Sequence, residues 1–376
     1  MPLPFIGSKR MSLGVEMELQ IIDAKTKDLF PGSPKIFEKL GGEQTHIKPE
    51  LVQSMIEINT GICNTIDEVR RDLDQQISTI QSVCRELGLE LASSGSHPFA
   101  RYTDRIIYPA DRYKYLIDRN RWMARRLMVF GLHVHVGMRN GDHAIAMNNA
   151  MLHYVPHVLA LSASSPFWQG MDTGLASCRV TVFEALPTAG HPCTFNSWRE
   201  FEQFYDSMIA SRSISSIKDI WWDIRPHPDY GTIELRVCDS LPNLNETVAL
   251  VAFIQALYHW FDEQHAAGTT FAPPPYWILR ENKWKASRYG VEAEIILDDS
   301  GRTARLADEI LHLLNTLEPH SRRLGVTEEL ASIPQMIMRG NSYARQRKIY
   351  EKEGTFLAVT ESLVKEFQSR SPLYPD

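Results

Sequence analysis

Two histidines lie two residues apart in the segment GLHVHVGM (131–138). Side chains alternate between the two faces of a β-strand, so His133 and His135 would share one face, opposite three aliphatic residues. Such a pair is typical of a metal site, of a catalytic pair, or of two hydrogen-bonded structural histidines. The histidine pattern alone leaves all three interpretations open.

Three other segments divide in the same way into an apolar and an ionic face. Each alternates aliphatic residues with charged ones, which is typical of a strand with one buried face. The segments are LGVEMELQ (13–20) with Glu16 and Glu18, SMIEINT (54–60) with Glu57, and GTIELRVCD (231–239) with Glu234 and Arg236.

The ionic faces of the four segments carry glutamate, histidine and arginine but no lysine. A solvated sheet face is the simpler interpretation, since antiparallel sheets often expose one face to water. Carboxylates on neighbouring strands, however, repel one another at pH 7 unless a cation lies among them. Carboxylates with one imidazole suit Mg²⁺ or Mn²⁺ better than Zn²⁺. If the strands are neighbours, the sequence therefore predicts a divalent metal site.

Glu50 and three arginines are further candidates for this site. Glu50 precedes Glu57 by seven residues, so it reaches the same face only if the chain turns or bulges near residues 53–54. The sequence has no GxxxxGK[ST] or GxGxxG motif, so bound ATP would be held by metal and arginine. HExxH and GxSxG are also missing, which argues against common zinc proteases and serine hydrolases. The arginine candidates are Arg179, Arg225 and Arg236, each with a structural ion pair as its alternative role.

The overall composition is typical of a globular protein and does not indicate nucleic acid or a membrane as its partner. Of the 376 residues, 43% are hydrophobic and 23% are charged, which is ordinary for such proteins. The net charge of −6 offers no basic excess for nucleic acid or an anionic membrane surface. We find no signal-type start and no apolar stretch that could span a bilayer. The five scattered cysteines contain no CxxC motif and predict reduced thiols in the cytoplasm.

Helical periodicity accounts for most of the remaining chain. One helix is expected from an N-cap at Asp67 to Gly88, and a second over 111–128, leading into the histidine strand. No repeat or interdomain linker is visible, so residues 1–376 are expected to form one domain. Its sheet core would span about 11–240 and its mainly helical part about 241–370. Further helices are expected at 144–162, 198–210, 246–265, 304–317 and 357–368.

A series of segments, taken in order, resembles the glutamate–cysteine ligase type 2 family, and most closely its YbdK-like carboxylate–amine ligase subgroup. The resemblance covers about residues 11–368. It includes the late stretch MIMRGNSYARQRKIYE at 336–351, and the ordered set is far more specific than any one member. The earlier segments are LGVEMELQIID, MIEINTG, GLHVHVGM, SASSPFWQGMDTGLASCR, WWDIRPHPDYGTIELRVCD and ENKWKASRYG.

The resemblance implies a fold similar to glutamine synthetase: an α+β fold with a curved antiparallel β-sheet funnel and helices packed outside. It implies that ATP and Mg²⁺ or Mn²⁺ are the cofactors, with Arg236 at the transferring phosphoryl group and Arg179 and Arg225 as further catalytic and nucleotide-binding candidates. His135 receives no role from the family and would support its neighbour. The implied metal ligands are Glu16, Glu18, Glu50, Glu57, His133 and Glu234.

The implied activity is ATP-dependent ligation of a carboxylate to an amine through an acyl phosphate, with a glutamate-like acid and cysteine or another amine. Small molecules would be the partners, and the oligomeric state stays open, with a homodimer as one option. One alternative is a metal-dependent hydrolase with His133 and His135 as zinc ligands. Another is a non-catalytic nucleotide or amino-acid sensor on the same fold. A sensor would be expected to have lost the metal-binding carboxylates, which are all present here.

Overall fold

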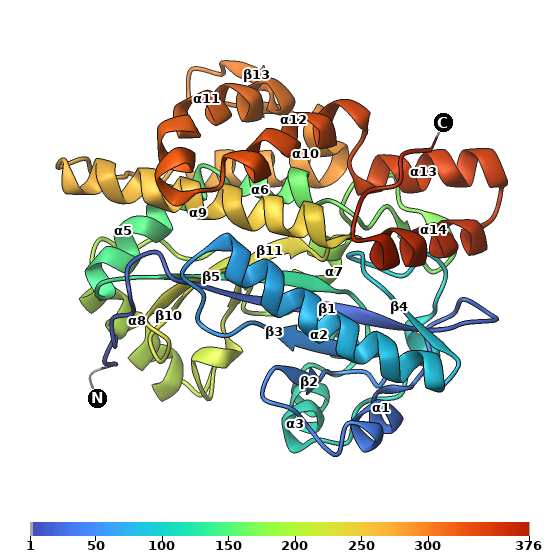
Figure 1. Cartoon of the computed structure of the whole chain (residues 1–376). Helices are drawn as coiled ribbons and strands as arrows, with labels where there is room; N and C mark the ends of the chain where they lie inside the picture. The colour runs from blue at the N-terminus through green and yellow to red at the C-terminus, as the bar shows by residue number, and fades with distance from the viewer. Residues whose placement is uncertain (1–2, 376) are drawn as a thin grey trace.

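The computed structural model describes residues 3–375, and its central feature is a seven-stranded β-sheet (Figure 1). The strand order is β10-β11-β5-β1-β3-β2, with β4 also paired to β1, and all these pairs are antiparallel. The strands are β1 (Leu13–Asp23), β2 (Ile47–Pro49), β3 (Met55–Asn59), β4 (Leu89–Ala92), β5 (Gly131–Gly137), β10 (Ile224–His227) and β11 (Thr232–Asp239).

The four segments with ionic faces form neighbouring strands, in the order β11, β5, β1 and β3. The register places Glu16 opposite His133 and Glu234 opposite His135. Because side chains directly opposite each other share a face of the sheet, the charged residues gather on one face. The predicted antiparallel sheet, with its ionic strands side by side, is confirmed.

The aliphatic residues of the same strands form the other face, and helices cover it. α2 (Ile66–Glu86), α5 (Gly141–Leu152) and α9 (Leu244–Ala266) contact the sheet, and α2 runs across the front of it in Figure 1. α9 is buried along most of its length because α11 (Leu306–Leu324) and α12 (Thr327–Arg339) pack on it from outside. The apolar face of the sheet is therefore part of a layered core, which leaves the ionic face for a site.

Smaller elements complete the described chain. Two-stranded sheets pair β6 (Phe167–Trp168) with β7 (Met171–Asp172), β8 (Ala189–Gly190) with β9 (Trp221–Trp222), and β12 (Glu294–Ile296) with β13 (Thr303–Arg305). Single 3-10 turns span Tyr102–Asp104, Ile217–Asp219 and Gly290–Glu292. The other helices are α1 (Ser33–Lys39), α3 (Asp111–Asn120), α4 (Trp122–Arg125), α6 (Val155–Ser162), α7 (Arg179–Phe183), α8 (Trp198–Ala210), α10 (Tyr276–Tyr289), α13 (Ser342–Glu353) and α14 (Phe356–Ser369).

Several predicted helices differ from the structure at their boundaries. α2 is capped by Thr65, whose side chain accepts a hydrogen bond from the Glu68 N–H, so the predicted N-cap at Asp67 is wrong. The predicted helix 111–128 is broken at Arg121, whose φ of 51° is left-handed and ends α3. The predicted helix 144–162 is α5 and α6, because Pro156 begins a new helix rather than continuing one.

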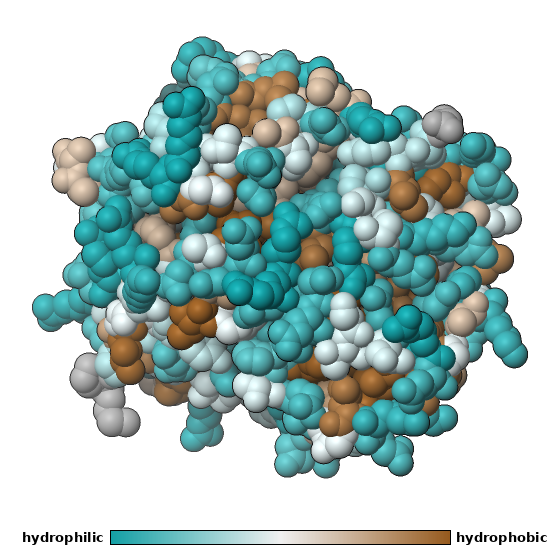
Figure 2. All heavy atoms as spheres, viewed as in Figure 1, coloured by the Kyte–Doolittle hydropathy of each residue, from teal (hydrophilic) through white to brown (hydrophobic). Residues whose placement is uncertain are grey.

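The helices expose polar surface to the solvent. The face drawn in Figure 2 is mostly hydrophilic, and its hydrophobic residues lie in separate small patches. None of the helices within residues 3–375 is long and apolar enough to cross a membrane.

Candidate active site

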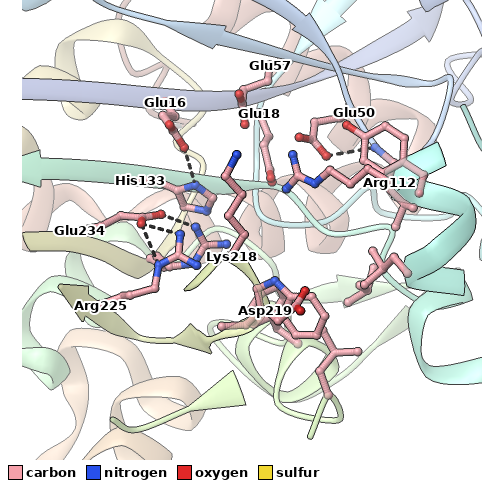
Figure 3. Close-up of a pocket in the computed structure, with 18 of the residues that line it drawn as sticks. Glu16, Glu18, Glu50, Glu57, Arg112, His133, Lys218, Asp219, Arg225 and Glu234 are labelled. Carbon is pink, nitrogen blue, oxygen red and sulfur yellow. Dashed lines mark hydrogen bonds and ion pairs between the residues drawn. The ribbon is translucent and has the colours of Figure 1, made fainter. Parts of the chain in front are cut away.

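A pocket with a cavity volume of about 370 Å³ lies on the ionic face of the sheet (Figure 3). Its floor is formed by the strands, and its walls come from the segments around α3, α7 and residues 215–221. The pocket brings together every residue predicted from the sequence as a metal, nucleotide or catalytic group. These are Glu16, Glu18, Glu50, Glu57, Arg179, His133, Arg225, Glu234 and Arg236.

Glu50 reaches the pocket through a β-hairpin. β2 and β3 are antiparallel neighbours joined by a turn, and Lys48 lies opposite Glu57. Glu50 follows Lys48 by two residues, so alternation returns its side chain to the face that carries Glu57. The turn expected near residues 53–54 is therefore present, with Glu50 directly after the neighbouring strand β2.

Glu16 lies between the two histidines of β5. Its Oε2 atom is 3.1 Å from His133 Nδ1, and its Oε1 atom is 3.6 Å from His135 Nε2. Burial alone would raise the pKa of Glu16, but its contacts with the two imidazoles lower that pKa well below its usual value. Burial lowers the pKa of His133 to about 4, so this imidazole is neutral at pH 7. A neutral imidazole beside an ionised carboxylate is a suitable pair of metal ligands.

His135 is held differently from His133. Its Nδ1 atom lies 2.9 Å from Thr232 Oγ1, while its buried Nε2 atom forms no hydrogen bond within residues 3–375. Burial disfavours the charged imidazole, yet the neighbouring carboxylates of Glu234 and Glu16 raise the pKa of His135. His135 thus supports Glu16 from the side opposite His133.

The other three glutamates of the floor are buried close to one another. Burial, together with the charge of Glu50, raises the pKa of Glu18 to about 7. Burial and the neighbouring carboxylates, Glu16 first among them, raise the pKa of Glu57 well above its usual value. Burial also raises the pKa of Glu50. Within the described chain none of the three carboxylates forms an ion pair. A cation bound here would therefore offset both the cost of burying their charges and the repulsion among them.

The donor set of the pocket fits a divalent cation. One ligand atom from each of Glu16, His133 and Glu234 lies within 4.8 Å of the other two. Oxygen-rich donors with one imidazole match the preference of Mg²⁺ and Mn²⁺. Gly131 allows the close packing around this group: a Cβ atom there would lie 2.2 Å from Arg179 Nη2 and 3.0 Å from His133 Nε2.

Arg225 and Arg236 hold Glu234 from two sides. The Nε and Nη2 atoms of Arg225 donate to Glu234 Oε2 over 3.0 and 2.6 Å, and its Nη1 donates to the carbonyls of Ile217 and Ile220. Arg236 donates from Nη1 to the other carboxylate oxygen. Although burial favours the neutral acid, the two guanidinium charges hold the pKa of Glu234 well below its usual range.

Two arginines in the pocket retain unused donors. Arg179 donates through its Nη atoms to the backbone carbonyls of Arg236 and Val237 at 3.1–3.3 Å. The Nε atoms of Arg179 and Arg236 are buried, and neither has a hydrogen-bond partner within residues 3–375. Buried N–H groups of this kind are costly unless an acceptor completes them. Oxygen atoms of a bound anion would be such acceptors.

Cationic and aromatic residues in the walls of the pocket were not predicted from the sequence. Arg112 and Lys218 point into the pocket from α3 and from the 3-10 turn at residues 217–219 (Figure 3). Tyr113 of α3 also lines the pocket. These segments lack the strand alternation that marked the floor, so nothing in their sequence indicated a site. Asp223, two residues before Arg225, does not line the pocket. Asp223 lies between β9 and β10 and pairs with Lys283 of α10 at 2.6 Å.

Comparisons with known proteins give a family match and solved structures of similar fold. The profile of glutamate–cysteine ligase family 2 matches residues 12–362. A relative from Bdellovibrio bacteriovorus, named "Putative glutamate–cysteine ligase 2", is 47% identical over 98% of this chain and 97% of its own. Glutamate–cysteine ligase from Francisella tularensis, solved with AMP, has a similar fold, with a TM-score of 0.69 at 13% identity over 99% of this chain and 91% of that one. A bifunctional glutathione synthetase from Pasteurella multocida follows with a TM-score of 0.67 at 16% identity, covering 96% of this chain and 52% of that one.

Proposed function

The chain belongs to glutamate–cysteine ligase family 2, and from that premise we propose that it joins a carboxylic acid to an amine with ATP as co-substrate. The observation that carries this proposal is the pocket in which buried carboxylates face unpaired guanidinium N–H groups. The acid is glutamate or a similar compound, and the amine is cysteine or another amine. The names of the relatives and the AMP bound to the structural neighbour support this assignment.

ATP is needed because a carboxylate does not react with an amine at neutral pH, since its oxygen is a poor leaving group. The substrate carboxylate oxygen attacks the γ-phosphorus, and ADP leaves. The amine nitrogen then attacks the acyl carbon of the resulting acyl phosphate, phosphate leaves, and the amine loses a proton to a base. The product is an amide.

Mg²⁺ or Mn²⁺ is the metal that the donor set fits, and it would neutralise phosphate charge when bound. Glu16, His133 and Glu234 would hold one ion, since their ligand atoms already lie close together. Glu18, Glu50 and Glu57 complete the proposed set of ligands. Burial and neighbouring carboxylates raise the pKa of each, so a bound cation would favour their ionised forms.

The arginines have separate tasks in this proposal. Arg236 contacts the transferring phosphoryl group, because its Nε donor is free and its ion pair with Glu234 fixes its position. Arg179 offers a second free Nε donor to the nucleotide phosphates. Arg225 positions Glu234, because its hydrogen bonds are made to protein groups. Developing negative charge would thus meet donors that are already oriented.

The two alternative functions find less support. A zinc hydrolase would use His133 and His135 as ligands, but the ligand atoms of the pocket that lie within 4.8 Å of one another come from Glu16, His133 and Glu234, and not from His135. A non-catalytic sensor would be expected to lack the metal carboxylates, whereas all of them line the pocket.

We also propose that the whole chain forms one catalytic domain that acts in the cytoplasm on small molecules, without nucleic acid or membrane partners, and that it can form a homodimer. One hydrophobic core that reaches from Met11 to Phe367 supports the single domain. Four buried cysteines and the exposed Cys193, all free thiols, support a reducing compartment.

A substrate screen tests the proposal. Purified protein with ATP and Mg²⁺ is given pairs of carboxylic acids and amines, including glutamate with cysteine, and ADP is measured. We expect ADP that requires both substrates, together with the amide product. ADP formation that ignores the amine, or hydrolysis without ATP, would contradict the ligase assignment.

A further inference from the structure

A second group of metal-binding side chains lies outside the pocket, where α11 packs on α9. His259 and Glu263 are four residues apart on α9, so they share one face of that helix. His320 of α11 faces them. The two Nδ1 atoms of the histidines are 3.0 Å apart. His259 Nδ1 lies 3.6 Å from Glu263 Oε1, and His320 Nδ1 lies 3.6 Å from the other oxygen, Oε2. These contacts form a triangle of three potential ligands from two helices.

The dimensions of this triangle match a tetrahedral ion site. Zinc binds histidine nitrogen at about 2.0–2.1 Å and carboxylate oxygen at about 2.0–2.2 Å. Tetrahedral angles then place neighbouring ligand atoms about 3.3–3.4 Å apart. The two Nδ1 atoms, 3.0 Å apart, are close to that value. One ligand atom from each of the three residues lies within 4.8 Å of the other two, so small side-chain rotations would complete the site.

We propose that His259, Glu263 and His320 bind one divalent ion of borderline softness, such as Zn²⁺, with the fourth position open to solvent. Two imidazoles and one carboxylate favour zinc, cobalt or nickel over Mg²⁺. The Glu263 side chain is 35% exposed, which gives an ion access from the solvent. Burial lowers the pKa of both imidazoles, so their lone pairs are available at neutral pH.

Arg323 contacts two of the three proposed ligands with its own positive charge. Its Nη2 atom lies 3.0 Å from Glu263 Oε2 and 3.2 Å from His320 Nδ1. The side chain is 51% exposed, so it can swing into solvent when an ion enters. Arg323 and the ion compete for the same acceptors. A variant without this charge should therefore bind the metal more tightly.

The bound ion would connect α9, which packs on the sheet, to the outer helix α11. Since two ligands come from α9 and the third from α11, the ion binds the folded chain in preference to the unfolded one, and so raises its melting temperature. This role is independent of the ligase reaction, because none of the three residues lines the active-site pocket.

Zinc titration calorimetry, together with melting curves, tests the proposal. The titrations contain millimolar Mg²⁺, which competes for the oxygen-rich ligands of the active-site pocket. We expect His259→Gln and His320→Gln each to weaken zinc binding by about tenfold or more, as loss of a ligand should exceed loss of a supporting residue. Arg323→Gln should tighten binding. The matched control is His312→Gln, on the exposed face of the same helix, which should bind zinc as the wild type does.

Three results would overturn the proposal. The first is a wild-type protein that binds no zinc at micromolar concentrations. The second is an isotherm that is lost in Glu16→Gln but kept in His320→Gln, because the ion would then lie in the active-site pocket. The third is Arg323→Gln with unchanged affinity, a variant at an exposed residue whose folding is not in question.

Discussion

Replacing Arg236 and Arg225 separately by lysine should separate a phosphoryl contact from a structural ion pair. Lysine keeps the charge of either residue but loses the planar fork of N–H donors. Arg236 forms one ion pair, with Glu234, which a lysine can retain, while its free Nε donor is lost. We therefore expect Arg236→Lys to lower kcat by about 30- to 1,000-fold, from roughly 2–4 kcal/mol of lost transition-state stabilisation.

Arg225→Lys should behave in the opposite way. Two of its four hydrogen bonds go to Glu234, which an ammonium group can still reach, and two go to the backbone carbonyls of Ile217 and Ile220. The carbonyls lose their donor inside the protein, at roughly 1–3 kcal/mol for each. We expect a loss of about 2–6 kcal/mol in the free energy of unfolding, which adds the two costs.

The assay measures ADP release at saturating ATP, Mg²⁺ and substrates, alongside thermal melting of each variant. The expected pattern is a low kcat with a near wild-type melting temperature for Arg236→Lys, and a clearly lower melting temperature for Arg225→Lys. An unchanged kcat in Arg236→Lys would refute the phosphoryl contact and leave only its ion pair with Glu234.

Three further predictions follow from named contacts. His133→Ala should lower activity or metal affinity more than His135→Ala, whose loss should cost about 10–100-fold as for a supporting residue; steady-state kinetics against Mg²⁺ concentration would reverse the assignment if His135→Ala were worse. His97 is buried, which lowers its pKa from 6.5 to about 4, so its neutral form contributes stability above pH 6.5 that is lost as the pH falls through 4. The full effect is about 3 kcal/mol, and urea unfolding of wild type and His97→Gln at pH 7 and pH 4 should show a stability difference that shrinks with acid; a constant difference would contradict it. Gly131→Ala should reduce turnover, because its Cβ would collide with Arg179 and crowd His133, and normal kinetics in this variant would show that the close packing is not needed.

The floor of the site was predictable from the sequence because side chains alternate between the two faces of a strand. Alternation with a period of two placed Glu16, Glu18 and Glu57 opposite aliphatic residues, and repulsion among carboxylates indicated a cation. The sequence could not show that the four strands are neighbours. The structure confirms it, because β11, β5, β1 and β3 are paired in that order. Glu50 needed the turn between β2 and β3, which the sequence allowed without requiring it.

The walls of the site were not predictable in the same way. Arg112 and Lys218 lie on a short helix and a 3-10 turn, where no repeating pattern marks an inward face. The break at Arg121 depends on a left-handed residue, a conformation that arginine seldom adopts and that its sequence does not signal. Asp223 lies outside the pocket that Arg225 lines, and its partner is Lys283, sixty residues further along the chain. Such long-range pairs follow from the fold rather than from local pattern.

The second histidine cluster shows the same limit. His259 and Glu263 have the spacing of a metal-binding helix face, but their third ligand lies on α11, sixty-one residues beyond His259. Only the packing of the two helices brings these side chains together.

The central claim is that the buried carboxylates of the sheet hold the metal for an ATP-dependent ligation. The most direct measurement compares wild type with Glu16→Gln in ADP formation with an acid and an amine, over a range of Mg²⁺ concentrations. The account predicts ADP formation by the wild type that needs both substrates and Mg²⁺, and a sharp loss in a Glu16→Gln protein that melts normally. Equal rates for the two proteins at ordinary Mg²⁺ concentrations, or ADP formation without Mg²⁺ or Mn²⁺, would contradict it.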